Sequence, residues 1–193
     1  MRKIWIVRHA ESKAQTGEQT GLDTSLSMKG LGQSRKIGSA LSEIRFDTVL
    51  VSPLRRARET YEASGLSATK ARFDSRLIES MPPGGYRDIL PYPNLPSYAM
   101  PDIHDAWHSD VADRANGIAA ELRSSQDENI LLISHAMFIG KLMEAMLLGG
   151  IRHETRIEFI FHTENASVSL LSFDSQESTS VKIRFWNRTD HLS

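Results

Sequence analysis

The sequence predicts an α/β fold, a three-layer α/β/α sandwich in which a mostly parallel sheet carries helices on both faces. Short apolar runs of strand length alternate with segments of helical periodicity through most of the 193 residues, an order typical of strand–helix–strand units. Hydrophobic residues make up 40% of the chain and charged residues 24%, a composition that suits a globular domain with a buried core. No repeat divides the sequence, so we expect a single domain over residues 1–193.

The N-terminal part begins with a compact apolar run, Ile4 to Val7, which predicts a short buried strand. Residues 10–24 are rich in Ser, Thr, Gln and Gly, a composition typical of a loop. Ser27 is a suitable N-cap, and we expect a helix after it because apolar residues recur there at helical spacing. The residues of this apolar stripe are Leu31, Ile37, Leu41 and Ile44.

The central part combines short strands with a proline-rich stretch. A second strand, Thr48 to Val51, precedes Pro53, and proline suits the first turn of a helix. Ala71 to Asp74 predicts a weak third strand. Residues 82–101 hold six of the seven prolines, whose fixed backbone and missing N–H donors are incompatible with regular structure. We therefore expect a long surface loop at about residues 80–101, placed like a lid over a site.

The C-terminal half returns to regular elements. Helical spacing resumes at Ile103 and continues to Leu122. Ile130 to Ile133 is the strongest candidate for a buried strand, and a helix from Met137 to Leu148 is expected to end at Gly149-Gly150. Three further strands are expected, at Ile157 to Phe161, Ser167 to Phe173 and Val181 to Trp186.

Composition and charge exclude several classes of function. The formal net charge of -1 provides no global field that would favour nucleic acid or an anionic membrane. The absence of cysteine excludes disulfides, thiolate metal sites and cysteine nucleophiles. The N-terminal apolar run is too short for a signal-peptide core, so we expect a cytoplasmic location. His104 and His108 have the spacing of a shared metal site on a helix, but nothing completes such a site, so neither a metal nor another cofactor is expected.

Polar residues directly follow three of the predicted strands. Arg8-His9 follows the first strand, Ser52-Pro53 the second, and Ser134-His135 the strongest one. In parallel sheets ligands bind beyond the carboxyl ends of the strands, so these residues are expected to share one site. Arg56, in the helix after the second strand, is expected to lie nearby.

These residue types suit phosphoryl transfer. A transferring phosphoryl group spreads negative charge over three oxygens, and guanidinium groups match that geometry with paired donors and a permanent charge. A neutral imidazole is a competent nucleophile, and a second imidazole can donate a hydrogen bond to a phosphoryl oxygen. A carboxylic acid can protonate the leaving alkoxide. No metal is needed where arginines neutralise the charge.

The same motifs resemble those of the histidine phosphatase superfamily, the phosphoglycerate mutase-like proteins. RHAES at residues 8–12 resembles the family signature after an apolar strand, SPLRRARET at 52–60 its arginine-bearing helix, and LLISHA at 131–136 its second-histidine strand. The further matches, in the same order, are LSMKG at 26–30, LIE at 77–79 and NASV at 165–168. The resemblance implies a phosphoglycerate mutase-like fold.

Carried over residue by residue, the resemblance implies a role for each motif residue. His9 would accept the phosphoryl group, while Arg8, Arg56 and His135 would form the phosphate pocket. Arg56 is preferred over Arg55 because it directly precedes the alanine of the family motif.

The remaining site residues also come from the resemblance. Glu79, in the LIE segment, would be the proton donor, with Glu11 as the alternative. Ser12, Gln15 and Thr20 lie where the family often contacts phosphate or substrate.

The expected function is therefore a metal-independent phosphatase that hydrolyses a small phosphate monoester through a phosphohistidine intermediate on His9 and releases inorganic phosphate. Two alternatives stay open: phosphoglycerate mutase-type phosphoryl transfer, and a phosphoprotein (phosphohistidine) phosphatase or binding module in signalling. Ala10 and Ala136 stand where glycine is common in the family, which permits a non-catalytic module. We expect no nucleic-acid or membrane partner, and tyrosines in the proline-rich loop leave a homodimer open.

Overall fold

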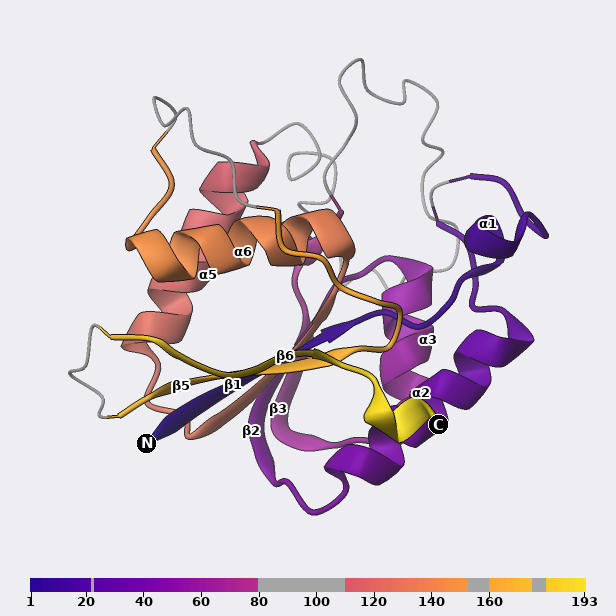
Figure 1. Ribbon diagram of the computed structural model, residues 1–193, viewed down its shortest axis with the longest axis horizontal. Helices are drawn as coiled ribbons and strands as arrows, with labels where there is room; N and C mark the ends of the chain where they lie inside the picture. Colours follow the sequence, from indigo (N-terminus) through magenta and orange to yellow (C-terminus); the bar gives the residue numbers. More distant parts are fainter. Residues whose placement is uncertain (22, 80–109, 153–159, 175–179) are drawn as a thin grey trace.

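A six-stranded sheet forms the centre of the molecule in the computed structural model, which describes residues 1–21, 23–79, 110–152, 160–174 and 180–193 (Figure 1). The strands are β1 (Arg2–Arg8), β2 (Phe46–Val51), β3 (Ala68–Phe73), β4 (Asn129–Ser134), β5 (Val168–Phe173) and β6 (Lys182–Arg188). Their order across the sheet is β3-β2-β4-β1-β5-β6. The pairs β3/β2, β2/β4 and β4/β1 are parallel, whereas β5 and β6 are added antiparallel at one side. The predicted, mostly parallel α/β sheet is confirmed.

The helices follow the strands in the predicted alternation. They are α1 (Lys13–Thr16), α2 (Met28–Leu41), α3 (Arg55–Ser64), α5 (Val111–Ser124) and α6 (Ala136–Leu148), with the 3₁₀ turns η1 (Ser75–Leu77) and η3 (Asp190–Leu192). Ser27 caps α2, its Oγ accepting a hydrogen bond from the amide of Gly30 at 3.0 Å. Gly149 ends α6 in the left-handed conformation with φ 74°, which glycine adopts without a side-chain clash. No helix within the described ranges is long and apolar enough to cross a bilayer.

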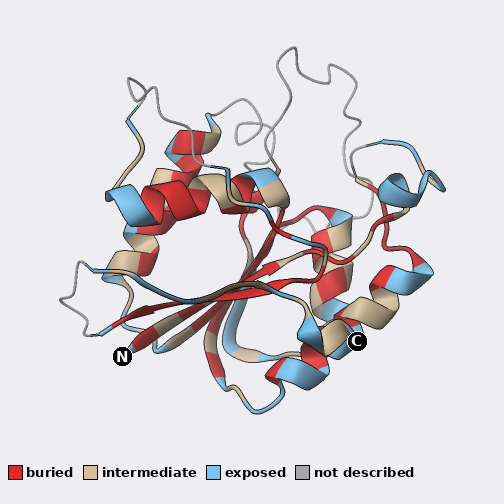
Figure 2. Ribbon diagram, viewed as in Figure 1, coloured by how far each residue is buried: buried red, intermediate tan, exposed pale blue. Residues whose placement is uncertain are grey.

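Two hydrophobic cores cover the two faces of the sheet, which gives the molecule three layers (Figure 2). One core joins the sheet to α5 and α6 through Ile118, Leu122, Phe138 and Leu142. The other joins it to α2 and α3 through side chains such as Ile37. Both faces of the central strands are therefore buried, as expected of a parallel sheet covered on each side.

The structure corrects the sequence prediction at five places. The polar stretch 10–24 contains the short helix α1, so it is not wholly loop. Helix α3 begins at Arg55, because Pro53 lies in the turn before the helix. The second strand begins two residues earlier than predicted, and the third begins at Ala68. Of the strand expected at 157–161, the described residues Ile160 and Phe161 are not in a strand.

Two further expectations concern residues that the structure does not describe. The proline-rich segment at 80–101 lies outside the described residues, as do Ile103, His104 and His108. The lid-like loop and the single-domain organisation therefore remain predictions.

Candidate active site

The ends of three neighbouring strands bring the predicted site residues together. In the sheet β1, β4 and β2 lie side by side, and His9, His135 and Ser52 each follow the end of one of these strands. Backbone hydrogen bonds extend this pairing beyond the strands: the amide of His9 donates to the carbonyl of Ser134 at 2.9 Å, and that of Ser52 to Ile133 at 2.9 Å. The sheet therefore places the two imidazole rings with their centroids 5.0 Å apart.

His9 is held in one tautomer by its own turn. Its Nδ1 lies 2.7 Å from the carbonyl oxygen of Ala10, so Nδ1 carries the proton and donates it to that oxygen. The lone pair of the ring is then on Nε2, which accepts a hydrogen bond from Arg56 Nε at 3.2 Å. The Ala10 amide is fixed in turn by Thr60 Oγ1 of α3 at 3.0 Å. The only lone pair of the His9 ring therefore faces a guanidinium group.

His135 is completely buried and oriented by Ser52. Its Nε2 lies 2.7 Å from Ser52 Oγ, while its Nδ1 has no hydrogen-bond partner within the described residues. A buried ring nitrogen without a partner is costly, unless a ligand supplies the missing group. His135 is also the N-cap of α6, so the partial positive charge of that helix terminus lies beside the ring.

Burial and neighbouring cations keep both imidazoles neutral at neutral pH. Burial lowers the pKa of His9 well below its ordinary value, and the charges of Arg56 and Arg8 lower it further, against the hydrogen bond to the Ala10 carbonyl. The pKa of His135 is likewise lowered by burial and by the charge of Arg56. The positive charge of the site is thus concentrated on the two guanidinium groups.

Arg8 completes the cationic side of the site. Its Nη1 donates to the carbonyl of Thr163, in the segment before β5. Its buried Nε has no hydrogen-bond partner within the described residues. Burial lowers the pKa of Arg8 while the charges of Glu79 and Glu164 raise it, so this guanidinium lies within electrostatic range of the predicted proton donor.

The Glu79 carboxylate lies over the first turn of α6. Its oxygens accept from the amide of Phe138 at 3.1 Å and, more weakly, from that of Met137 at 3.4 Å. Because α6 starts directly after His135, this position places Glu79 at the same sheet edge as the histidines. The alternative donor, Glu11, instead accepts from Ser27 Oγ at 2.8 Å and pairs with Lys29 at 2.9 Å, at the start of α2.

The chain matches known proteins over most of its length. The model of the histidine phosphatase superfamily (branch 1) matches residues 4–83 and 94–187. Phosphoserine phosphatase 1 of Hydrogenobacter thermophilus is 27% identical over 213 residues, covering 100% of this chain and 95% of the relative. The chain belongs to the histidine phosphatase superfamily.

Solved structures show the same fold. A phosphoserine phosphatase from Entamoeba histolytica superposes with a TM-score of 0.67 at 17% identity, over 100% of both chains. A mycobacterial glucosyl-3-phosphoglycerate phosphatase superposes with a TM-score of 0.65 at 23% identity, over 98% of this chain and 100% of that one. The phosphoglycerate mutase-like fold is therefore confirmed, and the protein is a phosphatase of the histidine phosphatase superfamily, a phosphoric monoester hydrolase.

The three further residues predicted to contact substrate differ in how they are connected to His9. In this histidine phosphatase Ser12 is buried, and its Oγ donates to Gln15 Oε1 at 3.2 Å. Gln15 Nε2 donates to Asn165 Oδ1 at 2.8 Å, and Asn165 Nδ2 donates to the His9 carbonyl at 3.1 Å. Thr20 is exposed and forms no side-chain hydrogen bond within the described residues. Ser12 and Gln15 are thus linked to the His9 turn, whereas Thr20 is not.

Two residues support the site of this histidine phosphatase in ways that sequence reasoning did not predict. Ser52 was expected at the site from its place at a strand end, but its role of orienting His135 was not. Arg114 is 5% exposed on α5 and donates to the backbone just before Glu79, but no local motif marks it. Arg55, in contrast, pairs with Glu59 at 2.7 Å on the surface of α3, which supports the preference for Arg56.

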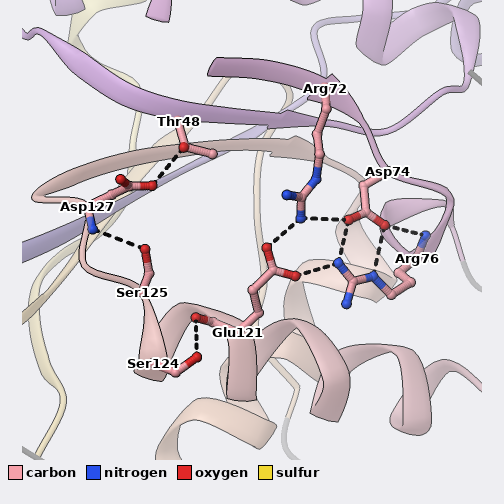
Figure 3. Close-up of polar contacts among 8 residues, drawn as sticks. All are labelled: Thr48, Arg72, Asp74, Arg76, Glu121, Ser124, Ser125 and Asp127. Atoms are coloured by element: carbon pink, nitrogen blue, oxygen red, sulfur yellow. Dashed lines mark hydrogen bonds and ion pairs between the residues drawn. The ribbon is translucent and has the colours of Figure 1, made fainter. Parts of the chain in front are cut away.

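Ion pairs fix the segment that leads from β3 to Glu79 (Figure 3). Asp74 is buried and pairs with Arg76 at 2.6 Å and with Arg72 at 3.3 Å. Glu121 of α5 pairs with the same two arginines. Burial opposes ionisation of Asp74, but hydrogen bonds and charge from Arg76 outweigh it and lower the pKa of Asp74. The turn η1 is thereby tied to α5 on the way to Glu79.

Proposed function

We propose that this phosphatase hydrolyses a small phosphate monoester through a phosphohistidine intermediate on His9. The observation that carries the proposal is the arrangement at His9 Nε2. Its lone pair accepts from Arg56 Nε at 3.2 Å, while Nδ1 is occupied by the Ala10 carbonyl at 2.7 Å. A neutral imidazole whose lone pair lies beside a guanidinium is suited to attack a phosphorus atom whose oxygens that guanidinium binds.

The phosphate pocket would consist of Arg8, Arg56 and His135. Two guanidinium groups supply permanent positive charge and parallel N–H donors for the phosphoryl oxygens. The unpartnered Nδ1 of His135 would donate to a third oxygen when Ser52 donates to its Nε2. Because these groups neutralise the transferred charge, the reaction is proposed to need no metal.

The reaction would proceed in two balanced steps. In the first, His9 Nε2 bonds to phosphorus, the ester P–O bond breaks, and the leaving oxygen takes the proton of the Glu79 carboxylic acid. In the second, water attacks the phosphohistidine, its proton passes to the Glu79 carboxylate, and the N–P bond breaks to release inorganic phosphate. Each half requires Glu79 within hydrogen-bond reach of the oxygen that gains or loses a proton.

The substrate is proposed to be a small ester bound beside α1. Gln15 and Thr20 are exposed and available for substrate contact, while Ser12 acts through Gln15. The relatives named for phosphoserine and glucosyl-3-phosphoglycerate place O-phosphoserine and phosphoglycerates first in a substrate panel.

The test is release of phosphate from a panel of esters by wild type, His9→Ala and the control His162→Ala. His162 is an exposed histidine paired with Glu164, so its removal leaves the site intact. We expect activity on at least one ester, abolished only in His9→Ala. Activity of His9→Ala within a few-fold of wild type would reject His9 as the nucleophile.

Two further measurements separate this mechanism from its alternatives. Enzyme quenched during turnover should carry an acid-labile, alkali-stable phosphoryl group, whereas an acid-stable adduct would indicate a serine ester. EDTA should leave the rate unchanged, and full loss that added metal restores would indicate a metal mechanism. Formation of phosphoglycerate isomers in place of free phosphate would indicate a mutase.

A further inference from the structure

Arg114 is buried between the backbone that leads to Glu79 and the first turn of α6, which binds the Glu79 carboxylate. It lies on α5 with 5% of its surface exposed, and it belongs to none of the motifs that identify the family. Burying a guanidinium group lowers stability unless its donors are paired, so the contacts of Arg114 indicate its role in the fold.

One side of the guanidinium holds the backbone that leads to Glu79. Arg114 Nη1 donates to the carbonyls of Arg76 at 2.9 Å and Ile78 at 2.8 Å. Nη2 lies 3.5 Å from the carbonyl of Glu79 itself, a weaker contact. Three of the last four carbonyls up to and including Glu79 thus face one side chain.

The other side of the guanidinium packs on the residue that binds the Glu79 carboxylate. The Arg114 Cζ lies 5.6 Å from the centroid of the Phe138 ring, within cation–π range. The amide of Phe138 is the shorter of the two donors to Glu79, at 3.1 Å. Arg114 therefore contacts both the backbone of Glu79 and the turn that receives its carboxylate.

Arg114 remains protonated near neutral pH. Burial lowers its pKa to about 10, although the charges of Glu79 and Asp110 raise it. Its positive charge is therefore available to attract the Glu79 carboxylate that forms when the leaving oxygen takes the proton.

We propose that Arg114 is the positioning residue for the proton donor: it fixes Glu79 over the start of α6 by binding the carbonyls of residues 76 and 78 while packing on Phe138. The inference rests on the acid role of Glu79 in the proposed function. A general acid displaced by about 1 Å can lose on the order of 100-fold in rate. In the first step such a loss falls on esters whose leaving group needs a proton and spares those whose leaving group does not, whereas the second step is the same for all esters.

The experiment compares two substrates in Arg114→Met and Arg114→Lys. One is p-nitrophenyl phosphate, whose leaving group departs without protonation, and the other is the best alkyl ester of the substrate panel. For Arg114→Met we expect kcat/KM on the alkyl ester, which reports phosphoryl transfer to His9 alone, to fall at least about 10-fold more than kcat/KM on the aryl ester. Arg114→Lys should recover part of that difference, because an ammonium group can still donate to one or two of the carbonyls.

The control is Arg123→Met, another arginine of α5, whose guanidinium donates to the carbonyl of Met146 far from Glu79. It should leave the ratio of alkyl to aryl rates unchanged. The double variant Glu79→Gln/Arg114→Met should have the same ratio as Glu79→Gln alone, because Arg114 acts only through that carboxyl group.

The outcomes distinguish this inference from the proposed function. Equal losses on both substrates in Arg114→Met, or an additional change of the ratio in the double variant, overturn the positioning role while leaving the function intact. Equal losses in Glu79→Gln overturn the acid role and the positioning role together. Where Arg114→Met fails to fold, the ratio measured for Arg114→Lys decides by the same criterion.

Discussion

Mild acid should destabilise this protein because two imidazoles are buried in their neutral form. His9 and His135 are 4% and 0% exposed, and burial lowers the pKa of each well below its ordinary value. In the unfolded chain both titrate near pH 6.5. Their contribution to stability is therefore complete above about pH 6.5. As the pH falls from there toward the lowered pKa values of the folded protein, the unfolded chain binds a proton at each of these two histidines that the folded protein does not, and the contribution is lost.

The expected loss follows from this proton uptake. Each histidine that stays neutral in the fold lowers the free energy of unfolding by up to about 1.4 kcal/mol for each pH unit of acidification. Between pH 7.0 and 5.5 this amounts to about 1.3 kcal/mol per histidine. The two together predict a fall of about 2.5 kcal/mol in the free energy of unfolding over that interval. The assay is urea unfolding followed by tryptophan fluorescence, since Trp5 packs against Phe46 and Phe185. Phosphate must be absent, because a ligand of the folded state would add its own stabilisation.

Single variants isolate each histidine. His9→Ala should lose about half of the pH dependence that the two site histidines contribute, since of this pair His135 alone would then take up a proton on unfolding. His162→Ala, at an exposed histidine, should leave the dependence unchanged. The same slope in His9→Ala and wild type would show that folding does not lower the pKa of His9, and the reasoning that burial keeps its lone pair free of a proton would then be wrong.

Three further substitutions test the surroundings of the site. Gly30→Ala would place a Cβ atom 2.0 Å from the carbonyl oxygen of Glu11, so the loop after β1 must shift. We therefore expect the free energy of unfolding, measured by thermal unfolding, to fall by about 1–3 kcal/mol and kcat to fall as well. Asp74→Asn should lower stability at pH 7 by about 1–3 kcal/mol. Because the fold lowers the pKa of Asp74, the stabilisation by its carboxylate, and with it the difference between variant and wild type, should disappear as the pH falls through that lowered pKa. Arg56→Met should weaken inhibition by inorganic phosphate about 10- to 100-fold, as expected for a lost charge-assisted contact.

Each substitution has a matched control. Gly32→Ala adds a Cβ with no atom within 4 Å, so it should be neutral or slightly stabilising in α2. Asp190→Asn breaks an exposed ion pair with Arg188 and should change stability little. Arg55→Met, on the surface of α3, should leave phosphate inhibition close to wild type. A control that behaves like its partner variant would mean that the effect is not specific to the contact named.

The convergence of the histidines was predictable because it follows from the sheet. The carboxyl ends of parallel strands meet at one edge, so a polar residue after each of three apolar runs is enough to mark that edge. His9, Ser52 and His135 follow β1, β2 and β4, which are indeed neighbours. What the sequence did not predict was the order of these strands, because pairing between distant segments leaves no local pattern.

Arg114 shows why the supporting contacts of the site were not predictable. An arginine in a helix is usually a solvated residue, and nothing in its neighbours distinguishes this one. Its contacts are with carbonyls 36 and 38 residues away, and backbone carbonyls carry no sequence signal. Helix α1 was missed for a related reason, since a segment of four residues is too short to show helical periodicity.

The site divides its charge and its reactivity between different side chains, and the acid sensitivity predicted above follows from that division. A phosphate pocket needs positive charge, but a protonated imidazole has no lone pair with which to attack phosphorus. In this fold the charge is carried by Arg8 and Arg56, which keep their protons, while burial and those same charges keep His9 neutral. If His9 accepts the phosphoryl group as proposed, the burial that makes it a nucleophile is the same burial that weakens the fold below pH 6.5. A substitution that exposes His9 to water should therefore reduce the acid sensitivity and the rate of phosphoryl transfer together.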